Sequence, residues 1–152
     1  MSKTKILMVC LGNICRSPLA EGILRSKLDP KKYIVDSVGT GSWHIGNPPD
    51  SRSIKVGAQN GIDISHLKGR QISEQDLIDF DHIFVMDQNN LEDVLTIATT
   101  KTQEEKISMI LDTIFPDEGV DVPDPYNGTM TDFKRVYEML DQACDIIATQ
   151  HT

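Results

Sequence analysis

Cysteine, aromatic side chains and positive charge are all scarce in this sequence of 152 residues. The three cysteines are an odd number, which argues against a framework of structural disulfides. Lysine and arginine total 15 against 23 acidic residues, and the net charge of −8 disfavours a nucleic-acid-binding surface or a polybasic membrane anchor. No apolar run approaches the roughly 18 residues of a membrane-spanning helix. The remaining composition, 39% hydrophobic and 25% charged, is typical of one globular domain.

The amino-terminal segment is not expected to be a secretion signal. Its apolar stretch, residues 6–9, is followed by Gly12, Asn13 and Arg16 before any cleavage site of the A-x-A kind. No two cysteines are spaced C-x-x-C, and no histidine-rich cluster completes a zinc site. We therefore expect a cytoplasmic protein with no metal site and with no nucleic acid or membrane as its partner.

Short apolar runs alternate with amphipathic segments along the chain. Buried strands are predicted over residues 6–9, 33–38, 83–86 and 106–111. Helices are predicted over residues 17–28, 50–60, 73–80, 89–97 and 133–148. Ser17 is expected to cap the first helix, with Pro18 as its first residue. This alternation predicts a single α/β domain over residues 1–152 with a parallel sheet, whose ligands bind beyond the carboxyl ends of the strands.

The segment between the first strand and the first helix has the features of an anion-binding loop. A strand that enters a tight loop and then a helix directs successive backbone N–H groups at one point. Gly12 and Asn13 tolerate the left-handed backbone that such a loop requires. Arg16 ends the loop with a planar guanidinium that can hold two phosphate oxygens at once.

Cys10 occupies the first position of this loop, where the same groups favour a thiolate over a thiol. A thiolate at the base of a phosphate site is placed for in-line attack on phosphorus. Ser17 can donate a hydrogen bond to the sulfur, which would also make the thiolate a better leaving group in a second step. The alternative, a thiol that is merely buried at the end of a strand, fits the surrounding loop less well.

A cysteine nucleophile that cleaves a phosphate ester needs a general acid from elsewhere in the chain. Residues 120–128 form a proline-stiffened segment that holds two carboxylates, Asp121 and Asp124. The pattern of residues alone does not choose between them.

Residues 9–18, VCLGNICRSP, resemble the signature of the low-molecular-weight protein tyrosine phosphatases almost letter for letter. Further similar blocks follow in the same order over nearly the whole chain, at residues 35–37, 45–50, 70–72, 85–87 and 124–126. The resemblance implies a central four-stranded parallel sheet with helices on both faces and the phosphate-binding loop after the first strand. It also implies hydrolysis of phosphotyrosine in proteins or peptides through a cysteinyl-phosphate intermediate, without metal or cofactor.

The resemblance assigns roles to individual residues of this chain. It implies that Asp124 is the general acid and base, beside Cys10 and Arg16. Trp43 and Tyr126 resemble the aromatic walls of the family's active-site cleft, where an apolar slot favours aryl phosphates. The phosphate loop and its supports are then Leu11, Gly12, Asn13, Ile14, Cys15, Ser17, Ser37 and His66. His66 is the weakest of these assignments because the segment that follows it looks one residue longer than the family's usual spacing.

Cys15 resembles the family's second loop cysteine, which predicts reversible redox regulation through a disulfide with Cys10; the alternative is a small packing residue. Asn127 stands where many family members have a second tyrosine, so regulation by phosphorylation of a tyrosine pair is not expected. A monomer with at most weak self-association is expected. The physiological substrate does not follow from the sequence.

Three other functions are weighed against this one. Thioredoxin-coupled arsenate reductases resemble the loop, but they need further cysteines in the middle of the chain, and none occurs between Cys15 and Cys144. Phosphoarginine phosphatases typically have threonine at the position of Ile14, where an apolar side chain suits an aryl phosphate. A phosphate-binding module without turnover would need neither Cys10 nor Asp124.

Overall fold

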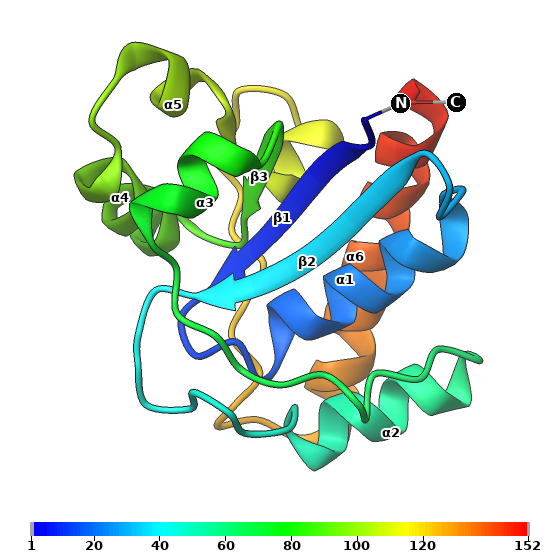
Figure 1. Ribbon diagram of the computed structural model, residues 1–152. Helices are drawn as coiled ribbons and strands as arrows, with labels where there is room; N and C mark the ends of the chain where they lie inside the picture. Colours follow the sequence, from blue (N-terminus) through cyan, green and yellow to red (C-terminus); the bar gives the residue numbers. More distant parts are fainter. Residues whose placement is uncertain (1, 152) are drawn as a thin grey trace.

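Four parallel strands form the centre of the computed structural model, which describes residues 2–151 (Figure 1). The strands are β1 (Thr4–Cys10), β2 (Tyr33–Gly39), β3 (His82–Val85) and β4 (Ile107–Met109). Their order in the sheet is β2-β1-β3-β4, so β1 lies in the interior with a paired neighbour on each side. The predicted single-domain α/β fold with a four-stranded parallel sheet is confirmed.

Helices cover both faces of this sheet. On one side lie α1 (Arg16–Lys27), α2 (Ser51–Gln59) and the long α6 (Met130–His151) (Figure 1). On the other side lie α3 (Glu74–Asp79) and α4 (Gln88–Ile97), with α5 (Lys101–Glu105) beside them (Figure 1). None of the helices formed by residues 2–151 combines the length and the apolar character that crossing a membrane requires.

The side chains of β1 explain why the sheet is buried on both faces. Successive residues of a strand point to opposite faces, and Ile6 and Met8 belong to the apolar cluster on the side of α1 and α6. Leu7 and Val9 belong to the cluster on the side of α3 and α4. All four are fully buried. The uninterrupted apolar run in the sequence is therefore the signature of a strand covered twice.

The structure differs from the prediction at the fourth strand, at the edge of the sheet. The fourth strand was expected over residues 106–111, but β4 has only three residues, and a 3₁₀-helix, η1 (Ile110–Thr113), follows it. Ile110 and Leu111 are nonetheless buried, because the 3₁₀-helix turns them into the core on the side of α6. Hydrophobicity alone does not distinguish these two ways of burying a short apolar run. The short helix α5 was not predicted.

The beginning of β1 and the end of α6 lie together at the amino edge of the sheet. Thr4 is the partner of Tyr33 in the parallel pairing of β1 with β2. The Tyr33 hydroxyl donates a hydrogen bond to the backbone carbonyl of His151. Cys10 lies at the opposite, carboxyl edge of the same sheet, where β1 ends.

That carboxyl edge is crowded by backbone as well as side chains. A Cβ atom on Gly39, the last residue of β2, would lie 2.7 Å from the carbonyl oxygen of Leu11 and 3.1 Å from the amide nitrogen of Asn13. Only glycine lets the end of β2 approach the loop after β1 so closely. The fold therefore presses this loop against the neighbouring strand.

Candidate active site

The loop from Cys10 to Arg16 curls around the Cys10 sulfur. The backbone N–H of Asn13 donates to that sulfur over 3.3 Å, and the Ser17 hydroxyl oxygen lies 3.0 Å from it. Asn13 has φ of 57°, the left-handed conformation that the sequence predicted for this position. The loop therefore directs hydrogen-bond donors at a buried sulfur, as an anion-binding loop requires.

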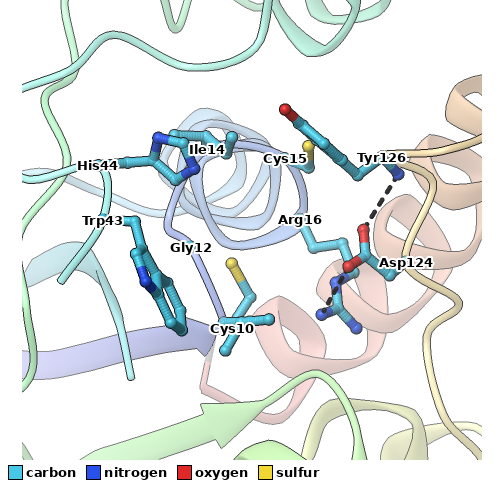
Figure 2. A pocket seen from close by; sticks show the side chains of 10 residues that line it. Cys10, Gly12, Ile14, Cys15, Arg16, Trp43, His44, Asp124 and Tyr126 are labelled. Carbon is cyan, nitrogen blue, oxygen red and sulfur yellow. Dashed lines mark hydrogen bonds and ion pairs between the residues drawn. The ribbon is translucent and has the colours of Figure 1, made fainter. Parts of the chain in front are cut away.

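Gly12 has a different role from the one predicted. Its φ is not positive, so the loop does not need its backbone freedom. Instead a Cβ atom at Gly12 would lie only 3.1 Å from Cδ2 of His44. Figure 2 shows the His44 ring beside Ile14, and both line the pocket. Gly12 thus provides room for a wall of the pocket.

Ser17 does not cap the first helix, contrary to the prediction. Helix α1 begins at Arg16, and its N-cap residue, Cys15, forms no side-chain capping bond. The Ser17 hydroxyl lies within hydrogen-bond distance of the Cys10 sulfur and of the Val38 carbonyl. A capping side chain would occupy the free N–H groups at the start of a helix, which a phosphate needs as donors.

Asn13 connects the loop to two neighbouring segments. Its side-chain amide donates to Ser17 over 2.8 Å and to Ser37 over 3.0 Å. Its side-chain oxygen accepts the backbone N–H of Arg70 over 3.0 Å. Three of the predicted supporting residues, Asn13, Ser17 and Ser37, are therefore brought together.

Glu21 completes this network and was missed from the sequence. The Ser37 hydroxyl donates to the Glu21 carboxyl group over 2.7 Å, and Arg25 lies 3.2 Å from its other oxygen. Burial raises the pKa of Glu21 to about 7, against the lowering effects of Ser37 and Arg25. The signal was present: Glu21 lies one helical turn from Ser17 and Leu24, on the side of α1 that faces the core.

His66 does not belong to the network, so its predicted supporting role is wrong in this structure. Its side chain is exposed, and no hydrogen bond joins it to the loop within residues 2–151. The backbone N–H of Arg70, rather than an imidazole, contacts the Asn13 side chain. Glu21 occupies the far side of Ser37.

Arg16 is buried and is held by two groups from distant segments. Its Nη1 donates to Asp87 over 2.7 Å and to the carbonyl of Val122 over 2.8 Å. Nε and Nη2 make no hydrogen bond to the rest of residues 2–151, so this edge of the guanidinium is available for two oxygens of a phosphate. Asp87 follows β3, at the sheet edge where β1 ends with Cys10, and this position was its signal in the sequence.

The structure separates the two candidate carboxylates. Asp121 accepts the backbone N–H of Gln88 at the start of α4, away from the Cys10 sulfur. Asp124 lines the pocket; its Oδ2 atom lies 3.9 Å from Nη2 of Arg16, and its side chain is 47% exposed. Figure 2 shows Asp124 facing the opening of the pocket from the side of Arg16. Of these two carboxylates, only Asp124 lines the pocket above Cys10.

The pocket above Cys10 has a volume of about 210 Å³. Trp43 and Tyr126 stand on opposite sides of it and are 69% and 48% exposed, with Leu11 at 41% (Figure 2). Large apolar side chains with this exposure form a slot for a flat aromatic group. The residues that line the pocket are Cys10, Leu11, Gly12, Ile14, Cys15, Arg16, Trp43, His44, Asp124 and Tyr126.

Cys15 is a buried thiol in the same pocket as Cys10. Burial, followed by the nearby carboxylate of Asp50, raises its pKa to about 12. Cys144 is fully buried on α6, in the apolar core, and its pKa is raised for the same first reason. All three cysteines are free thiols in this structure.

Within residues 2–151, no group of three or more histidine, cysteine, aspartate or glutamate side chains could hold a metal ion.

The sheet is parallel, and its carboxyl edge carries the cysteine loop. A buried arginine, an aspartate and two aromatic side chains surround the same pocket. This combination is typical of phosphatases with an α/β fold. Comparison with known proteins agrees with this class. The family model described as low molecular weight phosphotyrosine protein phosphatase matches residues 5–151. The chain therefore belongs to the low molecular weight phosphotyrosine protein phosphatase family and is a phosphatase.

Individual relatives are similar over most of their lengths. The low molecular weight protein-tyrosine-phosphatase YfkJ of Bacillus subtilis (strain 168) is 40% identical over 144 residues, which cover 92% of this chain and 90% of that protein. A protein tyrosine phosphatase from Entamoeba histolytica, crystallised with Hepes in the active site, has a TM-score of 0.91 at 37% identity, covering 98% of this chain and 97% of its own. Vibrio vulnificus Wzb in complex with benzylphosphonate has a TM-score of 0.88 at 30% identity, covering 98% and 99%.

Proposed function

We propose that this protein hydrolyses phosphotyrosine in proteins or peptides through a cysteinyl-phosphate on Cys10, with Arg16 as the phosphate ligand and Asp124 as general acid and base. One observation carries the proposal. The Cys10 sulfur, the free edge of the Arg16 guanidinium and the Asp124 carboxylate share one pocket of about 210 Å³. A tetrahedral phosphate held there can meet all three groups at once.

In the first step the Cys10 thiolate attacks phosphorus, and the bond between phosphorus and the ester oxygen breaks. Asp124, protonated, gives its proton to the departing phenol oxygen. Nε and Nη2 of Arg16, together with the backbone N–H groups of the loop, hold the phosphate oxygens on which charge is concentrated. The products of this step are the free phenol and a phosphocysteine.

In the second step water replaces the thiolate on phosphorus. Asp124, now a carboxylate, takes a proton from the attacking water, and the bond between sulfur and phosphorus breaks. Inorganic phosphate leaves, and the sulfur departs as a thiolate. Ser17, 3.0 Å from the sulfur, and the Asn13 N–H stabilise that charge by hydrogen bonds.

The walls of the pocket support the choice of an aryl phosphate. Trp43 and Tyr126 flank the position above Cys10, and Ile14 adds an apolar surface at the rim (Figure 2). The Vibrio relative was crystallised with benzylphosphonate, a phosphonate attached to an aromatic group. A slot with two aromatic walls stabilises a phenyl ring better than a short alkyl chain.

We further propose that Cys15 makes the enzyme reversibly sensitive to oxidants. Peroxide would oxidise the Cys10 thiolate to a sulfenic acid, with hydroxide as the other product. The Cys15 thiolate would then attack that sulfur, forming a disulfide and releasing hydroxide. Both cysteines line one pocket, which supports this step, whereas the raised pKa of Cys15 slows it.

Two substitutions test the core of the proposal. Cys10→Ser should reduce turnover of p-nitrophenyl phosphate below about 1% of wild type, because the loop does not ionise a hydroxyl; this corresponds to about 2.7 kcal/mol of barrier. Arg16→Lys should also be severely impaired, because an ammonium group cannot present two parallel donors. Circular dichroism would verify that both variants fold. Residual activity well above this level in Cys10→Ser would exclude Cys10 as the nucleophile.

A further inference from the structure

The start of α2 contacts the phosphate loop through its backbone and side chains. The N-cap residue Asp50 donates its backbone N–H to the carbonyl of Ile14 over 2.8 Å. Ser53, in the first turn, donates its hydroxyl to the carbonyl of Cys15 over 3.2 Å. The first turn of α2 is therefore fixed relative to the loop that holds Cys10.

Arg52, on the same turn, reaches the segment that carries Asp124. Its Nη2 donates to the carbonyl of Tyr126 over 2.8 Å, and its Nη1 donates to the carbonyl of Gly128 over 3.2 Å. Its guanidinium carbon also lies 5.7 Å from the centre of the Tyr126 ring and 4.4 Å from that of Phe133. Within residues 2–151, every hydrogen bond that joins residues 125–128 to another part of the fold comes from Arg52.

The Arg52 head group is itself held in place by a carboxylate. Its Nε lies 3.0 Å from Oδ1 of Asp50, and its Nη2 lies 3.0 Å from Oδ2. These two parallel hydrogen bonds are the paired geometry typical of arginine with a carboxylate. This hydrogen-bonding lowers the pKa of Asp50, so the pair stays charged. Asp50 therefore fixes the orientation of the Arg52 guanidinium that contacts Tyr126 and Gly128.

Only one further contact separates Arg52 from the proposed general acid. The backbone N–H of Tyr126 donates to Oδ1 of Asp124 over 3.1 Å, and the carbonyl of that same Tyr126 accepts from Arg52 (Figure 2 draws the Asp124–Tyr126 bond). Asp124 and Tyr126 lie in a segment without helix or strand, where few other contacts limit motion. A shift of Tyr126 would therefore move the Asp124 carboxylate.

We propose that Arg52 is a positioning residue for general-acid catalysis, which ties the segment of Asp124 to the phosphate loop through Asp50. The proposal rests on the proposed role of Asp124 as the acid. Arg52 does not line the pocket and does not touch the reacting atoms. Its contribution is to fix the distance between a proton donor on one loop and a phosphate held by another, on which proton transfer depends steeply.

The test compares substrates that differ in their need for an acid. For Arg52→Met, kcat/KM for phenyl phosphate should fall at least about tenfold, because a poor leaving group needs the proton. For 2,4-dinitrophenyl phosphate it should fall less than about threefold, since that leaving group needs little protonation. We choose kcat/KM because it reports the steps up to phosphoryl transfer and excludes the later hydrolysis.

Lys106→Met is the matched control. The Lys106 ammonium likewise donates to two backbone carbonyls, those of Leu77 and Ile78, but Lys106 directly precedes β4, at the amino edge of the sheet, and does not line the pocket. This variant should change kcat/KM for both substrates equally or not at all. Inhibition by inorganic phosphate should be unchanged in Arg52→Met, which would show that the phosphate loop is intact.

A double substitution links the effect to Asp124. In an Asp124→Asn background, Arg52→Met should lower kcat/KM for phenyl phosphate less than about twofold further, because no acid remains to be positioned. An equal loss on both substrates, or a full tenfold further loss in this background, would overturn the proposal. If Asp124→Asn itself shows no dependence on the leaving group, the assignment of the acid fails instead, and this inference with it.

Asp50→Asn provides a second test should Arg52→Met not fold. Asparagine also caps helices well, so α2 is retained, while the paired contact with Arg52 is lost. The same selective loss on phenyl phosphate is expected, at about threefold or more. An unselective loss, or none, would contradict the role of the Asp50–Arg52 pair.

Discussion

Nη1 of Arg16 lies 2.7 Å from Oδ2 of Asp87, and this contact joins the end of the phosphate loop to the start of α4. Both side chains are largely removed from solvent, at 3% and 15% exposure. Asp87 also accepts the backbone N–H of Asn90 and so caps α4. The Asp87 carboxylate therefore orients the Arg16 guanidinium and also caps α4.

Asp87→Asn should lower the free energy of unfolding by about 2 kcal/mol, because Arg16 would remain buried without its counter-charge. Asn still caps a helix, so Asp87→Ala should cost about 1 kcal/mol more. Urea unfolding of both variants would measure this. Phosphate should stabilise Asp87→Asn more than wild type, since it supplies the missing negative charge; equal stabilisation would contradict this account of the pair.

Asp124→Asn should lower turnover of phosphotyrosine about 10²-fold or more, since general-acid catalysis typically contributes that much. Asp121→Asn should remain within about twofold of wild type, because an amide oxygen can still accept the N–H of Gln88. Steady-state kinetics on a phosphotyrosine peptide would compare the two. A larger loss in Asp121→Asn would mean that the acid is wrongly assigned.

Peroxide should inactivate the enzyme, and a dithiol should restore it through reduction of a Cys10–Cys15 disulfide. Since the pKa of Cys15 is about 12, its thiolate fraction rises about tenfold per pH unit over the neutral range. The rate of disulfide formation, monitored by mass spectrometry, should therefore increase between pH 6 and 8. Cys15→Ser should be active but recover poorly, while Cys144 stays free. Full recovery of Cys15→Ser would make Cys15 a packing residue only.

Glu21 should make the protein less stable as the pH rises. Its pKa is raised from 4.5 to about 7 in the folded state, so folding favours the protonated form. The stability from that form is present in full below about pH 4.5 and is lost as the pH rises through about 7. Glu21→Gln keeps an acceptor for Ser37 but does not titrate. Its stability relative to wild type should therefore increase by about 2–3 kcal/mol between pH 4.5 and 7.5, as measured by urea unfolding.

The fold and the centre of the site could be predicted because they depend on local sequence. The apolar run of β1 is long enough to read as a strand buried on both faces, and residues 10–16 follow it directly. Asn13 sits in the left-handed conformation that its residue type allows. The choice of Asp124 over Asp121 did not follow from the residues, because it depends on where the end of β3 and the start of α4 lie.

Several partners of the site were missed because their contacts form only in the folded chain. Glu21, Asp87 and Arg52 are ordinary charged residues in the sequence, and only the folded chain brings them to the site. The prediction for His66 was wrong for a related reason: the backbone N–H of Arg70, and not the His66 imidazole, contacts the Asn13 side chain. Ser17 was predicted both to cap the first helix and to hydrogen-bond the Cys10 sulfur, and only the second contact is present.

The parallel sheet keeps the entrance of the pocket remote from the point where Thr4 and His151 lie together. Six strand intervals of β1, about 20 Å in all, separate Thr4 from Cys10. An affinity handle or a solid support attached beside Thr4 or His151 would therefore leave Trp43 and Tyr126 facing the solution. Beads carrying an inactive Cys10→Ser protein in this orientation would keep the pocket accessible to phosphotyrosine proteins in a mixture. Proteins retained on such beads would be candidate substrates.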